Sequence, residues 1–305
     1  MSHMNEFEII TAEFAKDDLI YIFLPVFLLA LIFELVLNHK KNLNLFQRDD
    51  TKASLWMLMM MVVVDIIPKF VVFAAFYYLH GISPLNDIVQ RQWWAWLVLF
   101  FLDDIIYYCF HRANHEVRFF WAGHIPHHSA IKMNFATALR QGVGERVHKY
   151  LFWLPLPLLG FDALMVFTMM SVNLFYQFWL HTELIKRLPR WFEFIFNTPS
   201  HHRVHHASNI RYLDCNHGGV FILWDRLFGS FSQEVEHDKV IYGLTENIKE
   251  FGPIHVATHE YQAIFKDVRR ANHWKDKLNY LLKSPGWSHD GKDKRAKTLR
   301  KAANL

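Results

Sequence analysis

Residues 93–115 read WWAWLVLFFLDDIIYYCFHRANH, an apolar run that ends in two histidines. Crossing the hydrocarbon core of a bilayer takes about 20 predominantly apolar residues in a helix, and Trp93–Phe110 forms one such candidate span. His111 and His115 follow it with i, i+4 spacing, which puts both imidazole rings on one face of a continuing helix. This stretch therefore predicts a membrane helix that carries metal-binding side chains at its end.

Other apolar segments extend this pattern to a multi-pass membrane protein. Leu19–Leu37 and Ala53–Tyr78 are each long enough to span a bilayer. Val147–Leu180 is longer, but two prolines and a glycine interrupt it, which is typical of a helical hairpin that either crosses the bilayer or re-enters it. We therefore expect an integral membrane helical bundle.

The overall composition agrees with this class. Apolar residues make up 52% of the 305 residues and charged residues only 20%, which suits a protein partly solvated by lipid. The net charge of +4 is too small to indicate a nucleic-acid partner, and no nucleic-acid-binding motif is visible. Cys109 and Cys215 are the only cysteines and lie far apart, so any metal is not held by thiolates.

The charges of the loops predict an orientation. Lysine and arginine are frequent in residues 38–52 and 112–149, whereas residues 79–92 contain only Arg91, and the segment before the first span is acidic. Because cytoplasmic loops of membrane proteins carry an excess of positive charge, we expect the N-terminus outside and every histidine cluster on the cytoplasmic side.

Two further histidine clusters repeat the spacing of the first. One is His124-Ile-Pro-His127-His128, and the other is His202-Arg-Val-His205-His206, with His201 before it. A lone histidine pair on a helix is more often a surface or core accident. Three clusters on one membrane side would leave many buried imidazole nitrogens unsatisfied without a metal. The candidate ligands are His111, His115, His124, His127, His128, His181, His201, His202, His205 and His206.

The number of ligands predicts two metal ions. Ten histidines, or nine without His201, exceed the four ligands of one tetrahedral zinc site. Neutral imidazole suits iron, copper, zinc or nickel. Soluble di-iron bundles use glutamates with a Glu-x-x-His pattern as ligands, whereas the three clusters here consist of histidines, so a histidine-rich dinuclear centre is expected instead.

Three other polar residues are candidates for catalytic or supporting roles. Asp104 lies seven residues before His111 on the same helix face, and we expect it to orient a histidine N–H group. Glu116 follows His115 directly; it could be a ligand, an acceptor for a histidine N–H or a solvated residue, and we favour the acceptor. Asn173 shares one helix stripe with His181.

The remaining histidines are expected to have no metal-binding role. His148 is predicted to be a surface or interface residue, and His255 and His273 are predicted to be solvated in the polar C-terminal part. The basic stretch after residue 291 is expected to be a solvated tail, although Trp274 and Trp287 could let it rest on anionic lipid.

These expectations together give an all-α fold with one domain over residues 1–305. Residues 19–180 hold the membrane spans and the first two histidine clusters. Residues 181–305 form a cytoplasmic, histidine-rich helical cap that contributes the third cluster and the basic tail.

At these residues the chain resembles the fatty acid hydroxylase and sterol desaturase superfamily. The resemblance covers most of the chain, and its wider segments favour the ether-lipid-cleaving branch and its bacterial relatives. The segments that carry it are HRANHE (111–116), WAGHIPHHS (121–129), QFWLHTE (177–183), NTPSHHRVHH (197–206), WDRLFG (224–229) and PGW (285–287).

The resemblance implies a membrane non-haem oxygenase that uses two iron ions and dioxygen. The family's eight ligands match the histidines of the three clusters, and His181 and His201 match further histidines. The acidic residue after the first cluster matches Glu116. The branch has tyrosine where this chain has His217, within Asn216-His-Gly-Gly219. Animal relatives use tetrahydrobiopterin as electron donor, and an electron-transfer protein is the alternative.

The leading hypothesis is hydroxylation of a lipid C–H bond. If that carbon adjoins an ether oxygen, the product is a hemiacetal, which collapses to an aldehyde and an alcohol. The alternatives are hydroxylation of a fatty acyl chain, a sterol-like lipid or a lipid headgroup, and desaturation. A non-enzyme alternative is a histidine-rich membrane metal transporter, which predicts ligands near the bilayer midplane. The resemblance to bacterial relatives favours a bacterial inner membrane.

Overall fold

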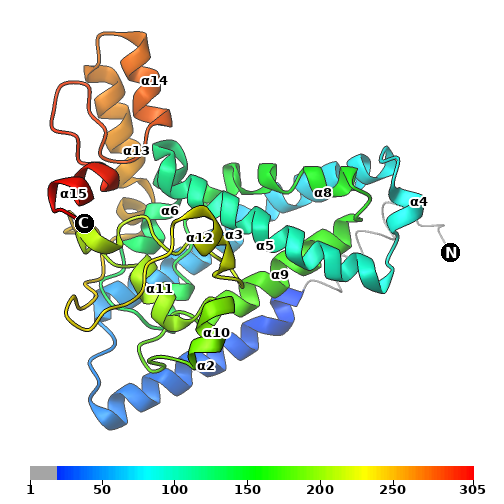
Figure 1. The fold of residues 1–305 in the computed structure, drawn as a ribbon, viewed down its shortest axis with the longest axis horizontal. Coiled ribbons are helices and arrows are strands. Elements are labelled where there is room, and N and C mark those ends of the chain that lie inside the picture. The colour runs from blue at the N-terminus through cyan, green and yellow to red at the C-terminus, as the bar shows by residue number, and fades with distance from the viewer. Residues whose placement is uncertain (1–18) are drawn as a thin grey trace.

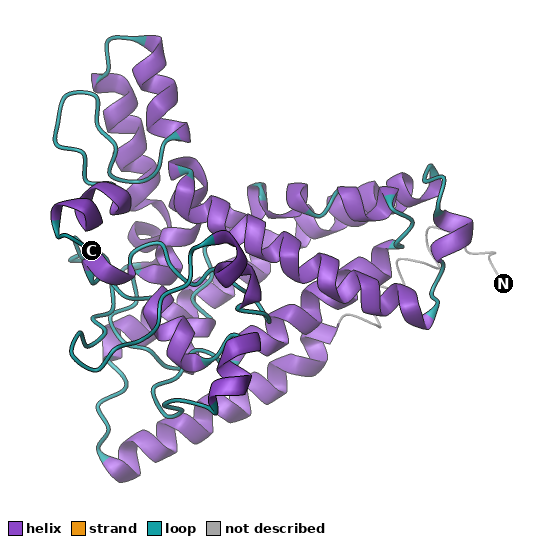
Figure 2. Ribbon diagram, viewed as in Figure 1, coloured by secondary structure: helices purple, strands orange, loops and turns teal. Residues whose placement is uncertain are grey.

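The computed structural model describes residues 19–305, and the acidic segment before the first span lies outside them. The long helices are α2 (Leu19–Lys41), α3 (Arg48–Gly81) and α5 (Trp93–Glu116). All three contain stretches long and apolar enough to cross a membrane. Among residues 19–305 every regular element is a helix, as Figure 2 shows, which confirms the prediction of an all-α membrane protein.

The surface of the long helices is apolar where a lipid tail would contact it. Leu29 of α2 and Val63 and Ile67 of α3 each expose more than 65% of their surface. Exposed apolar residues in such continuous rows are costly in water and favourable in hydrocarbon. The outer faces of α2 and α3 are therefore suited to lipid.

The segment Val147–Leu180 forms a hairpin whose first arm differs from the prediction. That arm consists of short turns, η2 (Lys149–Phe152) and α8 (Pro155–Leu158), and only the second arm, α9 (Ala163–Phe178), is a regular helix. Prolines lack the N–H group that a continuous helix needs. The irregular backbone is tolerated because it packs against protein; Ser83 Oγ donates a hydrogen bond of 2.8 Å to the carbonyl of Leu158 at the far end.

The shorter elements are mostly placed at the other end of the long helices, away from α4 (Figure 1). They connect the histidine segments to one another. In chain order the remaining helices are α4 (Asn86–Val89), α6 (Arg118–His128), α7 (Phe135–Ala138), η1 (Val143–Val147), α10 (Arg190–Ile195), α11 (Pro199–His205), η3 (Ile210–Tyr212), α12 (Leu223–Phe228), α13 (Pro253–Arg270), α14 (Trp274–Leu282) and α15 (Ala296–Ala302).

A buried ion pair fixes the start of α3 against the histidine end. Arg140 Nη1 donates to Asp50 Oδ1 at 2.5 Å, and neither side chain is more than 3% exposed. Arg140 is one of the cations of residues 112–149 that the loop-charge argument counted. Its backbone carbonyl lies 3.3 Å from His127 Nδ1, so the ion pair also positions a histidine.

Candidate metal centre

The structure brings nine of the ten candidate histidines into two adjacent groups. Within each group one ligand atom per residue lies within 4.8 Å of the others, and all nine residues are buried. His201 belongs to neither group. The five-histidine group comprises His111, His115, His124, His128 and His205, and the four-histidine group comprises His127, His181, His202 and His206.

The spacing of the clusters explains how they divide between the groups. On α6, His124 and His128 are separated by four residues and share one group, whereas His127 points to the other. On and just after α11 the pattern is reversed, since His205 joins the five-histidine group, whereas His202 and His206 join the four-histidine group. An i, i+3, i+4 cluster can thus supply two sites that lie side by side.

The distances between the imidazole nitrogens fit ligands of a common cation. His124 Nε2 lies 3.0 Å from His111 Nε2 and 3.2 Å from His128 Nε2. His202 Nε2 lies 2.9 Å from His181 Nε2. A metal–imidazole bond is about 2.0–2.1 Å, so two ligands at right angles around one ion stand about 3 Å apart. The nitrogens therefore have the separation that shared coordination requires.

The outer ring nitrogens fix the tautomers that coordination needs. His111 Nδ1 and His205 Nδ1 each lie 2.9 Å from a backbone carbonyl, of His217 and Cys215 respectively. His181 Nδ1 lies 3.0 Å from the carbonyl of Gln177. Because a carbonyl only accepts, each Nδ1 carries the proton, which leaves a lone pair on Nε2 toward the group. His205 Nε2 has no hydrogen-bond partner among the described residues, as expected for a ligand atom.

The protonation state of these rings also suits a metal. Burial lowers the pKa of His127, His128 and His205 well below the ordinary value for histidine, and neighbouring imidazoles lower it further. Burial lowers the pKa of His181 to about 4. These four rings are therefore neutral near pH 7, and neutral imidazole is the form that binds a metal ion.

A buried carboxylate that the sequence analysis missed supports the five-histidine group. Glu145 Oε1 lies 3.3 Å from His124 Nδ1 and accepts a 3.0 Å hydrogen bond from Asn114 Nδ2. Burial raises the pKa of Glu145, but the hydrogen bond with His124 and nearby positive charges outweigh this effect and hold the pKa below its ordinary value. Glu145 is therefore an ionised acceptor for a candidate ligand.

The same network corrects the prediction for His148. This residue is buried instead of lying on the surface, and its Nε2 lies 2.8 Å from Asn114 Oδ1. The sequence signal that could have revealed this network is the pair Gly123 and Gly142, which allows two backbone segments to approach closely. A Cβ added to Gly142 would stand 1.7 Å from the carbonyl oxygen of Gly123, so the segment before Glu145 packs directly on the backbone of α6.

Glu116 does not lie where the sequence analysis expected it. Its side chain is exposed and accepts a 2.7 Å hydrogen bond from Arg112 Nε on the surface of α5. One residue corresponds to about 100° around a helix, which turns Glu116 away from the face that His115 occupies. The expected contact between Glu116 and a histidine is therefore wrong in this structure.

Asp104 supports the centre indirectly. Its carboxylate accepts hydrogen bonds from the backbone N–H groups of Val220 (2.6 Å) and Phe221 (3.0 Å), and from Trp224 Nε1 (2.8 Å). It was expected to bind a histidine N–H, and these contacts replace that role. Asp104 instead fixes the loop whose His217 carbonyl lies beside His111 Nδ1.

Asn173 connects Asp104 to the four-histidine group. Asn173 Nδ2 donates to Asp104 Oδ1 at 3.2 Å, and its Oδ1 accepts from Gln177 Nε2 at 2.6 Å. The carbonyl of Gln177 in turn accepts from His181 Nδ1. The stripe of polar residues on α9 is thus a chain of hydrogen bonds that ends at a candidate ligand.

His201 and His217 are buried close to the groups without belonging to them. The ring of His201 packs against Phe231, with centroids 5.5 Å apart. The ring of His217 lies 4.9 Å from that of His115, and its Nδ1 has no hydrogen-bond partner among the described residues. Burial lowers the pKa of each to about 3, so both rings are neutral.

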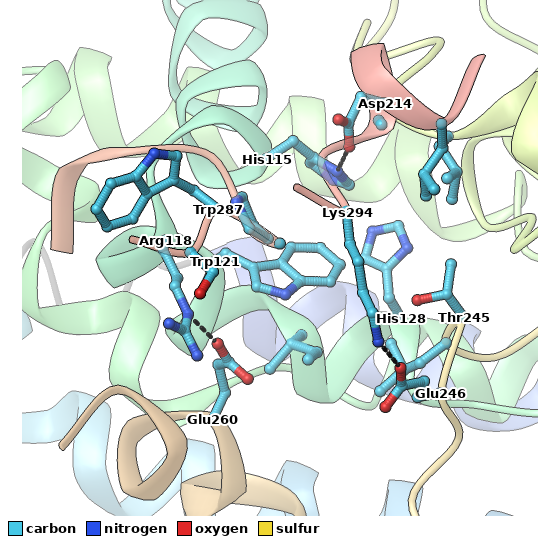
Figure 3. A pocket seen from close by; sticks show the side chains of 18 of the residues that line it. His115, Arg118, Trp121, His128, Asp214, Thr245, Glu246, Glu260, Trp287 and Lys294 are labelled. Carbon is cyan, nitrogen blue, oxygen red and sulfur yellow. Dashed lines mark hydrogen bonds and ion pairs between the residues drawn. The ribbon is translucent and has the colours of Figure 1, made fainter. Parts of the chain in front are cut away.

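A cavity of about 770 Å³ reaches the five-histidine group (Figure 3). His115, His128 and His205 line it, together with Trp121 and Trp287. Its other walls come from α6, residues 207–214 and the C-terminal segments. They carry ion pairs, including Arg118 with Glu260 (2.7 Å) and Lys294 with Glu246 (2.6 Å), which Figure 3 shows. The cavity is therefore a polar approach to the candidate centre.

Comparison with known proteins gives consistent matches. Residues 96–230 match the family described as fatty acid hydroxylase, a range that contains all nine histidines. Alkylglycerol monooxygenase of Homo sapiens is 44% identical over 195 residues, covering 64% of this chain and 43% of that protein. The Danio rerio protein of the same name is 38% identical over 266 residues, covering 87% of this chain and 58% of that protein.

A bacterial relative is more distant. An ornithine lipid hydroxylase of Rhizobium tropici is 28% identical over 142 residues, covering 46% of this chain and 43% of that protein. The chain spans about half the length of the curated relatives it matches. No solved structure matches the chain.

Proposed function

We propose that the chain is an oxygen-dependent lipid monooxygenase that binds two iron ions, because residues 96–230 match the fatty acid hydroxylase family. The observation that carries the proposal is the pair of buried histidine groups, whose unprotonated nitrogens converge at coordination distance. Bound iron would supply the activation of dioxygen that no amino-acid side chain provides.

The proposed reaction inserts one oxygen atom of O₂ into a lipid C–H bond. The other oxygen atom leaves as water, which requires two electrons and two protons from a donor. If the carbon adjoins an ether oxygen, as the name alkylglycerol monooxygenase suggests for the relatives, the hydroxylated product is a hemiacetal that collapses to an aldehyde and an alcohol. Hydroxylation of a lipid headgroup is the second candidate, supported by the similarity to an ornithine lipid hydroxylase.

The protein's own residues hold and shield the centre. Backbone carbonyls and Glu145 fix the histidine rings, so that the ligand atoms are oriented before any ion binds. The nine histidines are at most 4% exposed, which limits the access of water to the reactive centre. In this proposal Asp104 and Asn173 are positioning residues, whereas Glu116, exposed and paired with Arg112, takes no part.

The electron donor is proposed to approach through the cavity. Trp121 and Trp287 offer aromatic faces there, and the cavity reaches His115 and His128. Tetrahydrobiopterin, the donor of the animal relatives in the resemblance, is planar and polar, which suits aromatic walls with charged neighbours. An electron-transfer protein that docks at the cavity mouth is the alternative.

The proposal treats residues 1–305 as one unit, because both halves of the chain contribute ligands to each group. A metal transporter would need ligands along a path near the bilayer midplane. Here the ligands cluster beyond the end of α5's apolar run, which favours an enzyme.

We expect purified, iron-replete protein to contain about two iron atoms per chain, because nine ligands exceed the needs of one ion. Elemental analysis measures this content. Mass spectrometry of membranes that contain active protein should show a hydroxylated or cleaved lipid, and oxygen uptake should accompany it. One metal site under every metal supply would contradict the dinuclear proposal, and metal flux without oxygen uptake would favour a transporter.

We further propose a bacterial inner membrane location with the histidine groups and their helical cap on the cytoplasmic side. An impermeant thiol reagent should label Asp87→Cys from outside intact cells but not Lys40→Cys, in a background where Cys109 and Cys215 are replaced. The support is the positive charge of the loop between α2 and α3. External labelling of Lys40→Cys with protection of Asp87→Cys would reverse the orientation.

A further inference from the structure

The C-terminal helices α13 and α14 form a hairpin at the histidine end of the molecule. The two helices pack against each other and against α6, and α13 also packs against α3. Figure 1 shows the two helices side by side and running across the direction of α5. From its end near α6, α5 extends toward the right of the view, and α14 lies to the right of α13. If α3 and α5 cross a membrane, this hairpin runs along the membrane plane.

One face of α14 is an apolar stripe that no described residue covers. Trp274, Leu278 and Leu282 follow each other at i, i+4 and i+8, which puts them on one side of the helix. They are 68%, 43% and 55% exposed. Tyr280 lies on the opposite side and is 1% exposed, so the helix buries one face in the protein and presents a second apolar face outward.

Contacts with α3 place the hairpin at the border of the bilayer. Val256 and Ala257 of α13 pack against Met57 of α3. The charged first turn of α3 ends at Lys52. Met57 lies five residues after Lys52, which corresponds to about 7.5 Å along the helix. Interfacial helices bury their apolar face about 5–10 Å into the boundary between headgroups and acyl chains, so α13 begins at this depth.

Positive charges border the apolar stripe. Lys275 and Lys277 lie on either side of the stripe around the helix, and both are exposed. Lysines beside an apolar face, with a tryptophan at its end, are typical of helices that lie on anionic lipid. The same chain already contains spans that anchor it in a bilayer, so a lipid surface is the one partner that is always within reach.

We propose that the α13–α14 hairpin lies on the bilayer surface, with the stripe Trp274, Leu278 and Leu282 inserted between anionic lipid headgroups. This contact is independent of the metal groups and of the proposed reaction. It has a consequence for the cavity, because Glu260 and Asp267 of α13 each bind Arg118 at 2.7 Å. A hairpin fixed by lipid would hold one wall of the polar approach to the five-histidine group.

The test uses the full chain in lipid nanodiscs with a single fluorophore. Leu278→Cys is labelled with an environment-sensitive dye, and Asp276→Cys, on the side of the helix that Tyr280 occupies, is the matched control, with Cys109 and Cys215 replaced in both. We expect lipids that carry a quencher near the headgroup to quench the dye at position 278 several-fold more than at 276. Equal quenching at both positions, or none at 278, would overturn the proposal.

A second arm tests the anionic headgroups. Replacing both lysines, Lys275→Gln with Lys277→Gln, should reduce quenching at position 278 in nanodiscs that contain phosphatidylglycerol, and should have little effect in purely zwitterionic nanodiscs. An unchanged signal in anionic nanodiscs would refute the charge contribution. All measurements are made on metal-free as well as iron-loaded protein, so failure of the oxygenase proposal would not affect their interpretation.

Discussion

Replacing His127 with alanine is expected to abolish lipid oxidation and to lower the iron content from about two atoms per chain to about one. The four-histidine group would keep only three ligands, because His127 is one of its four members. Changes to groups that merely support a ligand cost about 10- to 100-fold in metal affinity or activity, so loss of a ligand should cost more than about 100-fold. Elemental analysis and mass spectrometry of the lipid product measure the two effects.

His205→Ala should abolish activity as well, but with a smaller loss of metal. The five-histidine group would keep four ligands, which is enough to bind an ion with altered geometry. His255→Ala and His273→Ala are the controls, because neither residue belongs to a group, and both should retain iron and activity. Full activity in His127→Ala would show that the histidine groups do not form the reaction centre.

The three histidine clusters could be predicted from the sequence because the geometry within each cluster is local. Separations of three and four residues place side chains together on a helix whatever the rest of the fold does. The apolar length of a membrane span is likewise a property of one segment. The structure brings nine of the ten candidate ligands together, and only the structure divides them into five and four.

His201 shows the limit of that argument. It stands next to His202, and adjacent residues on a helix point in directions about 100° apart. The cluster pattern could not decide which of the two neighbours faces the centre. In the structure His202 joins the four-histidine group, whereas His201 packs against Phe231.

Contacts between distant segments could not be predicted. Glu145 reaches His124 across 21 positions of the chain, and Asn114 reaches Glu145 across 31. Arg140 is one of several arginines in a basic loop by sequence, and only packing against α3 distinguishes it from a solvated cation. Glu116 was favoured as a supporting acceptor because it follows His115 in the sequence. Adjacency in the sequence does not give adjacency in space, and Glu116 pairs with Arg112 instead.

Glu145→Gln is expected to weaken iron binding at the five-histidine group by about 10- to 100-fold while leaving the four-histidine group occupied. The amide of glutamine can keep an oxygen beside His124 Nδ1, but it lacks the negative charge that strengthens the contact. A chelator should therefore release one of the two ions faster than in the unmodified protein, and the second ion at the unchanged rate. Release is followed by elemental analysis at timed intervals.

The matched control for this change is Glu236→Gln, which makes the same chemical substitution at an exposed position. It should leave both release rates unchanged. Glu145→Ala should release the first ion faster still, because it also leaves Asn114 Nδ2 without its acceptor. A purely structural role for Glu145 would accelerate the release of both ions together, since unfolding opens both groups. Wild-type release of both ions in Glu145→Gln would show that this carboxylate does not support His124 as a ligand.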